Sequence, residues 1–161
     1  MTPKSPPNIT VFDIADWFLT KAKSEDKSLR HMKLQKLVYF AYGWYCAYFD
    51  EYLFPEKIFA WPHGPVIEEL YHRYKYSGSN QINVNNAVHQ TFDDHVAWVM
   101  RQVWKNFSHY SDMELSHVTH RPGSPWDSVY DSSARDAEIP PETIREYFKG
   151  LREKYENAQP K

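Results

Sequence analysis

Residues 32–49 read MKLQKLVYFAYGWYCAYF, and we expect this stretch to form the helix around which the rest of the chain folds. Two lysines near its start, Lys33 and Lys36, are followed by a run without charge from Leu37 to Phe49. Apolar side chains recur at helical spacing on one side, and aromatic side chains occupy the other. A helix that is apolar all round belongs in a protein core. The uncharged run is shorter than the ~20 residues that span a bilayer, so it predicts a central core helix.

Length and composition restrict the class of protein. A chain of 161 residues fits one compact domain. Aromatic residues make up 17% of it, a high share that suits a large core or an interaction surface. The net charge is −2 and no dense run of lysine and arginine occurs, which argues against nucleic acid as the main partner. The single cysteine, Cys46, lies in the apolar run, so one chain can form neither a disulfide nor a cysteine zinc site.

The chain divides into a tail over residues 1–9, one domain over 10–156 and a second tail over 157–161. Three residue pairs have the spacing of helix capping boxes: Thr10 with Asp13, Thr91 with Asp94, and Ser111 with Glu114. Apolar periodicity and these start signals predict helices over residues 11–20, 32–49, 65–74, 92–107, 112–118 and 140–155. The predicted fold class is therefore mainly α, at most α+β, built around one buried helix.

Short extended segments complete the expected fold. Residues 58–61 are a strand candidate, and we expect them to pair with the alternating apolar residues Ile82 and Val84. The prolines and glycine of residues 62–65 predict a turn, with Pro65 as the first residue of a helix. Residues 121–126 contain two more prolines and a glycine, and we predict a loop there.

The histidines are the candidate residues for metal binding or catalysis. His117 and His120 are three residues apart and could face one metal ion, with His109, His63 or a carboxylate as the third ligand. A metal-dependent hydrolase is therefore one hypothesis. Ser116 and His120 could also meet on one helical face, but no orienting group or oxyanion donor is evident. The simpler alternative is a surface or capping histidine pair, and we assign no catalytic residue, no metal and no cofactor.

Two tryptophans in irregular segments are the most informative candidates for binding. Trp61 and Trp126 each lie next to a proline and close to an expected helix start. Such an indole either covers the edge of the core or forms a rigid anchor in a protein–protein interface. Both interpretations remain open from the sequence.

Five segments in a fixed order resemble one family, the Panacea domain, also called the SocA-like or GepA-like antitoxin domain of bacterial and prophage genomes. The segments are MKLQKLVYFAYGWY at 32–45, IFAWPHGPV at 58–66 with ELY at 69–71, LSHVTH at 115–120 with PW at 125–126, AR at 134–135, and IPPETIREYF at 139–148. The resemblance covers residues 11–148. It implies a helical, non-enzymatic domain that neutralises a toxin.

The resemblance implies a cognate protein toxin, encoded by an adjacent gene, as the partner. The alternative is a proteolytic adaptor that delivers a toxin or other client to a cytoplasmic protease. We expect the partner surface at these residues: Trp61, His63, Pro65, Glu68, Tyr71, Thr119, His120 and Trp126. Thr119 and His120 could equally be structural, with the threonine capping local backbone and the histidine holding the proline-rich loop.

Two features of the sequence depart from the family or limit what is expected. His63 stands where an aromatic residue such as tyrosine is more usual before Gly-Pro, so the local surface could be tuned to a particular partner. About ten residues precede the first expected helix, which is too few for a helix-turn-helix.

The N-terminal MTPKSPPNIT has no hydrophobic signal core, which indicates the cytoplasm and no membrane. A homo-oligomer is compatible with the sequence.

Overall fold

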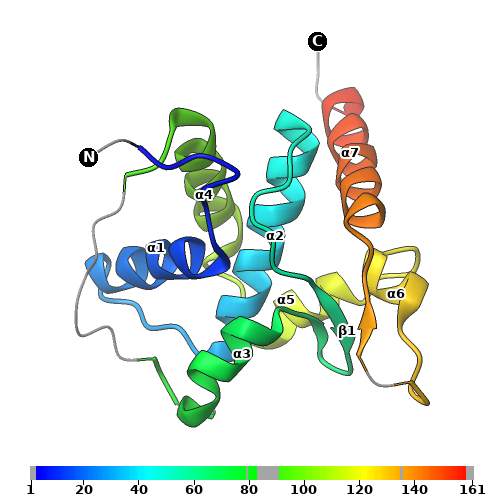
Figure 1. Ribbon diagram of the computed structural model, residues 1–161, viewed down its shortest axis with the longest axis horizontal. Coiled ribbons are helices and arrows are strands. Elements are labelled where there is room, and N and C mark those ends of the chain that lie inside the picture. The colour runs from blue at the N-terminus through cyan, green and yellow to red at the C-terminus, as the bar shows by residue number, and fades with distance from the viewer. Residues whose placement is uncertain (1–2, 79, 83–90, 135, 159–161) are drawn as a thin grey trace.

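The computed structural model describes residues 3–78, 80–82, 91–134 and 136–158. In these ranges the chain is mainly helical, with seven α-helices and a small three-stranded antiparallel sheet, which confirms the predicted fold class (Figure 1). The helices are α1 (Val11–Ser24), α2 (His31–Phe49), α3 (Glu68–Tyr74), α4 (Asp94–Phe107), α5 (Asp112–Thr119), α6 (Pro125–Val129) and α7 (Pro141–Ala158), with a 3-10 turn η1 (Lys75–Ser77) after α3. The strands are β1 (Phe59–Trp61), β2 (Gly64–Val66) and β3 (Ala137–Glu138). None of the described helices is long and apolar enough to cross a membrane.

Helix α2 lies in the middle of the molecule, as its sequence predicts. It packs against α1, α3, α4, α5, α7 and β2, and most of its side chains are buried (Figure 1). Helix α7 approaches α2 closely at Gly43, where a Cβ atom would overlap the ring of Phe148. The lysine side chain of Lys36 is also buried in this core.

Two of the three predicted capping boxes are present; the third, Thr91 with Asp94, is wrong, because Asp93 caps α4 and accepts from the N–H of Val96. The Thr10 side chain accepts from the backbone N–H of Asp13, and the Asp13 carboxylate accepts from the N–H of Thr10 at 2.9 Å. Ser111 and Glu114 make the same reciprocal pair at the start of α5. Each box satisfies backbone donors that a helix start leaves free.

The sheet corrects the predicted strand pairing. β1 forms a hairpin with β2, in the register Phe59↔Val66, Ala60↔Pro65 and Trp61↔Gly64, and its other edge pairs with β3. The expected pairing of residues 58–61 with Ile82 is wrong, since the N–H of Ile82 donates to the carbonyl of Leu29 instead. Val84 lies outside the described residues. A two-residue connection closes a local hairpin, which has little entropic cost compared with a pairing to a distant segment.

Two prolines act differently from the prediction. Pro65 lies inside strand β2, not at a helix start, and α3 begins only at Glu68. Proline is tolerated there because β2 is an edge strand of the sheet. Pro125 is the first residue of α6, so the segment predicted as a loop ends in a helix. The Ser124 side chain caps that helix, and proline suits its first position.

Candidate functional site

Residues 61–67 form the hairpin end and the strand that leads into α3. We call this segment the 61–67 hairpin. Side chains from α2, α5 and α6 bind its backbone at successive positions. This arrangement brings together segments that are far apart in the sequence, and it fixes the path of the hairpin backbone.

Side chains from α5 and α6 hold the first half of the 61–67 hairpin. Three of them reach carbonyl oxygens of consecutive residues: Trp126 Nε1 donates to Trp61 O at 2.6 Å, His120 Nε2 lies 3.0 Å from Pro62 O, and Ser116 Oγ donates to His63 O at 2.8 Å. Ser116 lies in the last turn of α5 and His120, four residues later, is the C-cap of that helix. The α5–α6 connection is itself held, because Ser124 Oγ donates to Thr119 O at 2.9 Å.

Two neighbouring residues of α2, Gln35 and Lys36, bind the second half of the 61–67 hairpin. Lys36 Nζ donates to Pro65 O at 3.2 Å. The Gln35 amide binds Ile67 at two points, donating to its carbonyl at 3.0 Å and accepting from its N–H at 2.9 Å. The buried glutamine therefore pairs with the backbone as a neighbouring strand would, which satisfies polar groups at the buried junction between β2 and α3.

Lys36 shapes the electrostatics of this region. Its ammonium group is fully enclosed, and burial lowers the pKa of Lys36 to about 7. A Cβ atom on Gly64 would come within 2.8 Å of both Lys36 Cε and Thr119 Oγ1, and Gly64 has a φ of +120°. Only glycine fits both conditions. Burial, together with the charge of Lys36, also lowers the pKa of His31 to about 4.

His120 is held on three sides. Its Nδ1 lies 2.5 Å from Ser116 O and its Nε2 lies 3.0 Å from Pro62 O, while its ring packs on Trp126 with centroids 3.9 Å apart. Both carbonyls are acceptors, so a ring N–H that faces either of them donates to it. The Ser116 hydroxyl donates to His63 O and does not face the imidazole, so a nucleophile–base pair is not formed.

The structure offers no third ligand, among the described residues, for a metal ion bound by His117 and His120. Among the residues that the structure describes, no group of three or more histidine, cysteine, aspartate and glutamate side chains is arranged to hold a metal ion. His117 is exposed, and its neighbour in the hypothesis, His120, has both ring nitrogens next to backbone carbonyls.

The outer face of the hairpin carries exposed aromatic and histidine side chains. The ring of Trp61 meets that of Tyr71 edge-on at 5.0 Å, and its Nε1 donates to Asp136 at 3.0 Å. Tyr71 is 36% exposed, and the side chain of His63 is exposed at the hairpin tip. Glu68 lies beside this pair, and burial together with the charge of Asp136 raises the pKa of its carboxyl group.

The eight residues expected at the partner surface fall into two groups. Trp61, His63, Glu68 and Tyr71 retain exposed surface. Pro65, Thr119 and Trp126 are buried, and His120 is half-buried. All eight belong to the hairpin, to the start of α3, or to the α5–α6 segment that binds the hairpin.

Sequence reasoning missed three residues that hold this region. Gln35 and Lys36 are polar residues at the start of an otherwise apolar helix, and their position inside a buried stretch was the available signal. Asp136, which accepts from Trp61, gave no signal because the two residues are 75 positions apart in the sequence.

Comparisons with known proteins agree with this arrangement. A family model described as "Antitoxin SocA-like, Panacea domain" matches residues 34–127, a range that includes most of α2, the hairpin, α5 and Trp126. The protein named Antitoxin SocA from Caulobacter vibrioides (strain NA1000 / CB15N) is 25% identical over 138 residues, covering 78% of this chain and 73% of the relative. No solved structure matches the chain. Since the family model spans more than half of the sequence, the chain belongs to the SocA-like Panacea domain family.

Proposed function

We propose that this chain is an antitoxin that neutralises a cognate cytoplasmic protein toxin by direct binding. Family membership and a relative named as an antitoxin support the proposal. We place the toxin contact on the outer face of the 61–67 hairpin and the adjoining part of α3. The toxin is expected to be encoded by an adjacent gene.

The observation that carries this proposal is the binding of the hairpin backbone by side chains of three helices. The carbonyls of Trp61 and His63 are held by hydrogen bonds, and the rings of Trp61 and Tyr71 pack edge-on, before any partner arrives. A preformed surface loses little conformational entropy on binding, which favours affinity. Tryptophan and tyrosine are also the residue types that dominate the energetics of protein–protein interfaces.

In this proposal the buried members of the predicted site act indirectly. Thr119 and Trp126 have 3% and 9% of their surface exposed, which leaves little area for a partner. The Thr119 hydroxyl donates to Ser116 O within α5, and the Trp126 indole donates to the carbonyl of Trp61. Their loss would therefore change the shape of the surface rather than remove a contact.

The test is co-expression with the product of the adjacent gene, followed by growth and copurification assays. His63→Ala and Tyr71→Ala remove side chains that we place in the contact. A central aromatic contact contributes at least about 2 kcal/mol, so we expect Tyr71→Ala to weaken the complex roughly thirtyfold. Met113→Ala, which removes a side chain that is 81% exposed on α5, is the control and should bind normally.

Two outcomes would decide against the proposal. The first is an adjacent gene product that is harmless alone and forms no complex with this chain. The second is normal binding by both variants with weakened binding by Met113→Ala, which would move the contact elsewhere. The toxin's half-life distinguishes masking from the adaptor alternative, because an adaptor shortens it and a masking antitoxin does not.

A further inference from the structure

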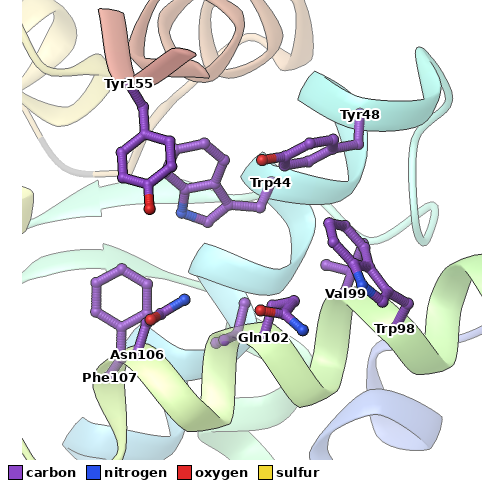
Figure 2. Close-up of a pocket in the computed structure, with 9 residues that line it drawn as sticks. Trp44, Tyr48, Trp98, Val99, Gln102, Asn106, Phe107 and Tyr155 are labelled. Carbon is purple, nitrogen blue, oxygen red and sulfur yellow. The ribbon is translucent and has the colours of Figure 1, made fainter. Parts of the chain in front are cut away.

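A pocket lies between α2, α5 and α7, beside the end of α4. We call it the α2–α5–α7 pocket. Its volume is about 300 Å³, at the lower end of the range of ligand pockets. Three of its side chains, Trp44, Phe107 and Tyr155, also line a neighbouring groove of about 440 Å³, where Figure 2 shows them. The two hollows therefore adjoin, and the smaller one has the size of a small-molecule site.

Aromatic rings form most of the walls of the α2–α5–α7 pocket. Phe40 and Phe107 stack with ring centroids 4.5 Å apart. Phe148 meets the ring of Tyr39 edge-on at 5.6 Å and that of Trp44 at 5.4 Å. Aromatic rings pair edge to face or in offset stacks, so walls of this kind favour a flat ring as the occupant.

Tyr39 brings an unused hydroxyl to this pocket. The residue is 2% exposed, yet its hydroxyl has no hydrogen-bond partner among the residues that the structure describes. In that part of the chain, Arg145 Nε is the only fully enclosed side-chain nitrogen or oxygen without a partner, so the Tyr39 hydroxyl is still within reach of a small molecule. Burial raises the pKa of Tyr39, so the hydroxyl keeps its proton and can donate. Buried polar groups normally have a partner, and an acceptor on a ligand would supply it here.

Arg121 brings a positive charge to the same pocket. Among the described residues that line it, Arg121 is the only one with a charged side chain. It is exposed, and it forms no ion pair, side-chain hydrogen bond or ring contact with any described residue. A guanidinium with free N–H groups is suited to a carboxylate, which can accept two parallel hydrogen bonds from it.

Tyr39 and Arg121 lie at the same end of the pocket. Lys36 and Thr119 adjoin, because a Cβ atom on Gly64 would lie 2.8 Å from a side-chain atom of each. Tyr39 follows Lys36 by one helical turn, and Arg121 follows Thr119 by two residues. The other end of the pocket is formed by residues further along α2 and α7, which lie side by side (Figure 1). The pocket is therefore polar at one end and aromatic at the other.

We propose that the α2–α5–α7 pocket binds a small aromatic carboxylic acid, with its carboxylate at Arg121 and Tyr39 and its ring between the aromatic walls. A phosphate ester carries a second negative charge, for which the described lining offers no second cation. The C-terminus of a protein would add a peptide N–H that needs its own acceptor. This inference goes beyond toxin binding and is tested on the chain alone, so its failure leaves the proposed function standing.

The experiment is isothermal titration calorimetry of the full chain with 2-naphthoate as the probe. We expect saturable binding of one molecule per chain, in the micromolar to low-millimolar range that a ligand of so few atoms reaches. The amide 2-naphthamide has the same shape without the charge, and it should bind at least roughly tenfold more weakly. The phosphate ester 2-naphthyl phosphate and an acetylated tripeptide ending in phenylalanine represent the other occupants, and both should bind more weakly than 2-naphthoate.

Two pairs of variants locate the site. Arg121→Gln removes the charge and should weaken binding of 2-naphthoate at least roughly tenfold, whereas Arg101→Gln changes an exposed arginine outside the pocket and should have no effect. Tyr39→Phe removes one hydroxyl and should weaken binding roughly fivefold, the effect of one hydrogen bond. Its control is Tyr45→Phe, because Tyr45 is equally buried on the same helix but does not line the pocket. Thermal unfolding should give similar Tm values for all four variants, which shows that each is folded.

Four results would overturn the proposal. The first is equal binding of 2-naphthamide and 2-naphthoate, and the second is unchanged binding by folded Arg121→Gln or Tyr39→Phe. The third is tighter binding of the phosphate ester or of the tripeptide, which would assign the pocket to a phosphate or to a protein C-terminus. The fourth is the absence of saturable binding of 2-naphthoate at low-millimolar concentrations.

Discussion

Replacing Lys36 by methionine should change how stability depends on pH. The pKa of Lys36 falls from an ordinary value of 10.5 to about 7 because the folded chain buries its ammonium group. Between these two pKa values the unfolded chain binds a proton that the folded chain does not. The free energy of unfolding of the unaltered chain therefore rises with pH across this window. Methionine does not titrate, so Lys36→Met loses this part of the pH dependence.

The size of the effect follows from the two pKa values. At ~1.4 kcal/mol per pKa unit, burial of the Lys36 ammonium costs about 5 kcal/mol at pH 6 and about 1 kcal/mol at pH 10. The variant leaves Pro65 O without its donor, which costs about 1–3 kcal/mol at every pH. Lys36→Met should thus be more stable than the unaltered chain at pH 6, by about 2–4 kcal/mol. That advantage should disappear by pH 10.

Urea unfolding at intervals from pH 6 to pH 10 measures this difference. Lys57→Met is the control, because Lys57 is exposed and its substitution should leave the pH dependence unchanged. Other titrating groups contribute equally to all three chains and cancel in the comparison, except His31, whose pKa the charge of Lys36 helps to lower and which matters only at the acidic end of this range. If the free energy of unfolding changed with pH in the same way for Lys36→Met and the unaltered chain, the reasoning would be refuted. Lys36 would then not lose its proton near neutral pH in the folded chain.

Two further substitutions test the hairpin and the core. His120→Ala removes two polar contacts and the packing on Trp126, so we expect a loss of ~2–3 kcal/mol and a fall in Tm of roughly 5–10 °C by thermal unfolding. An unchanged Tm with weakened toxin binding would instead make His120 a contact residue. Gly43→Ala should cost ~1–3 kcal/mol because the added methyl group overlaps Phe148, whereas the control Gly150→Ala, with open space around its Cβ, should stabilise by ~0.5–1 kcal/mol. Equal effects of the two glycine substitutions in urea unfolding would contradict the close approach of α2 and α7.

Local signals in the sequence were enough to predict most of the helices. The central helix followed from a long uncharged run, and the starts of α1 and α5 followed from capping boxes that the structure confirms. These features depend on residues within one or two helical turns of each other. Periodicity and capping report such neighbours directly.

The sheet and the hairpin contacts could not be predicted in the same way. Proline inside β2 is acceptable only because that strand lies at the edge of the sheet, and the sequence does not state which strand is at the edge. The hydrogen bond from Trp126 to Trp61 and that from Trp61 to Asp136 each join distant segments. Their existence depends on packing around α2, which local patterns do not describe.

The side chains that hold the 61–67 hairpin share one property that bears on specificity. Every one of them binds a backbone atom of the hairpin, whether a carbonyl oxygen or the N–H of Ile67. Backbone atoms are the same for all residue types, so these contacts do not depend on which side chain stands at the exposed tip. His63 can therefore be exchanged while the hairpin keeps its path, whereas Gly64 cannot, because the space and the φ angle there require glycine. A scaffold of this kind allows the recognition surface to change independently of the fold that presents it.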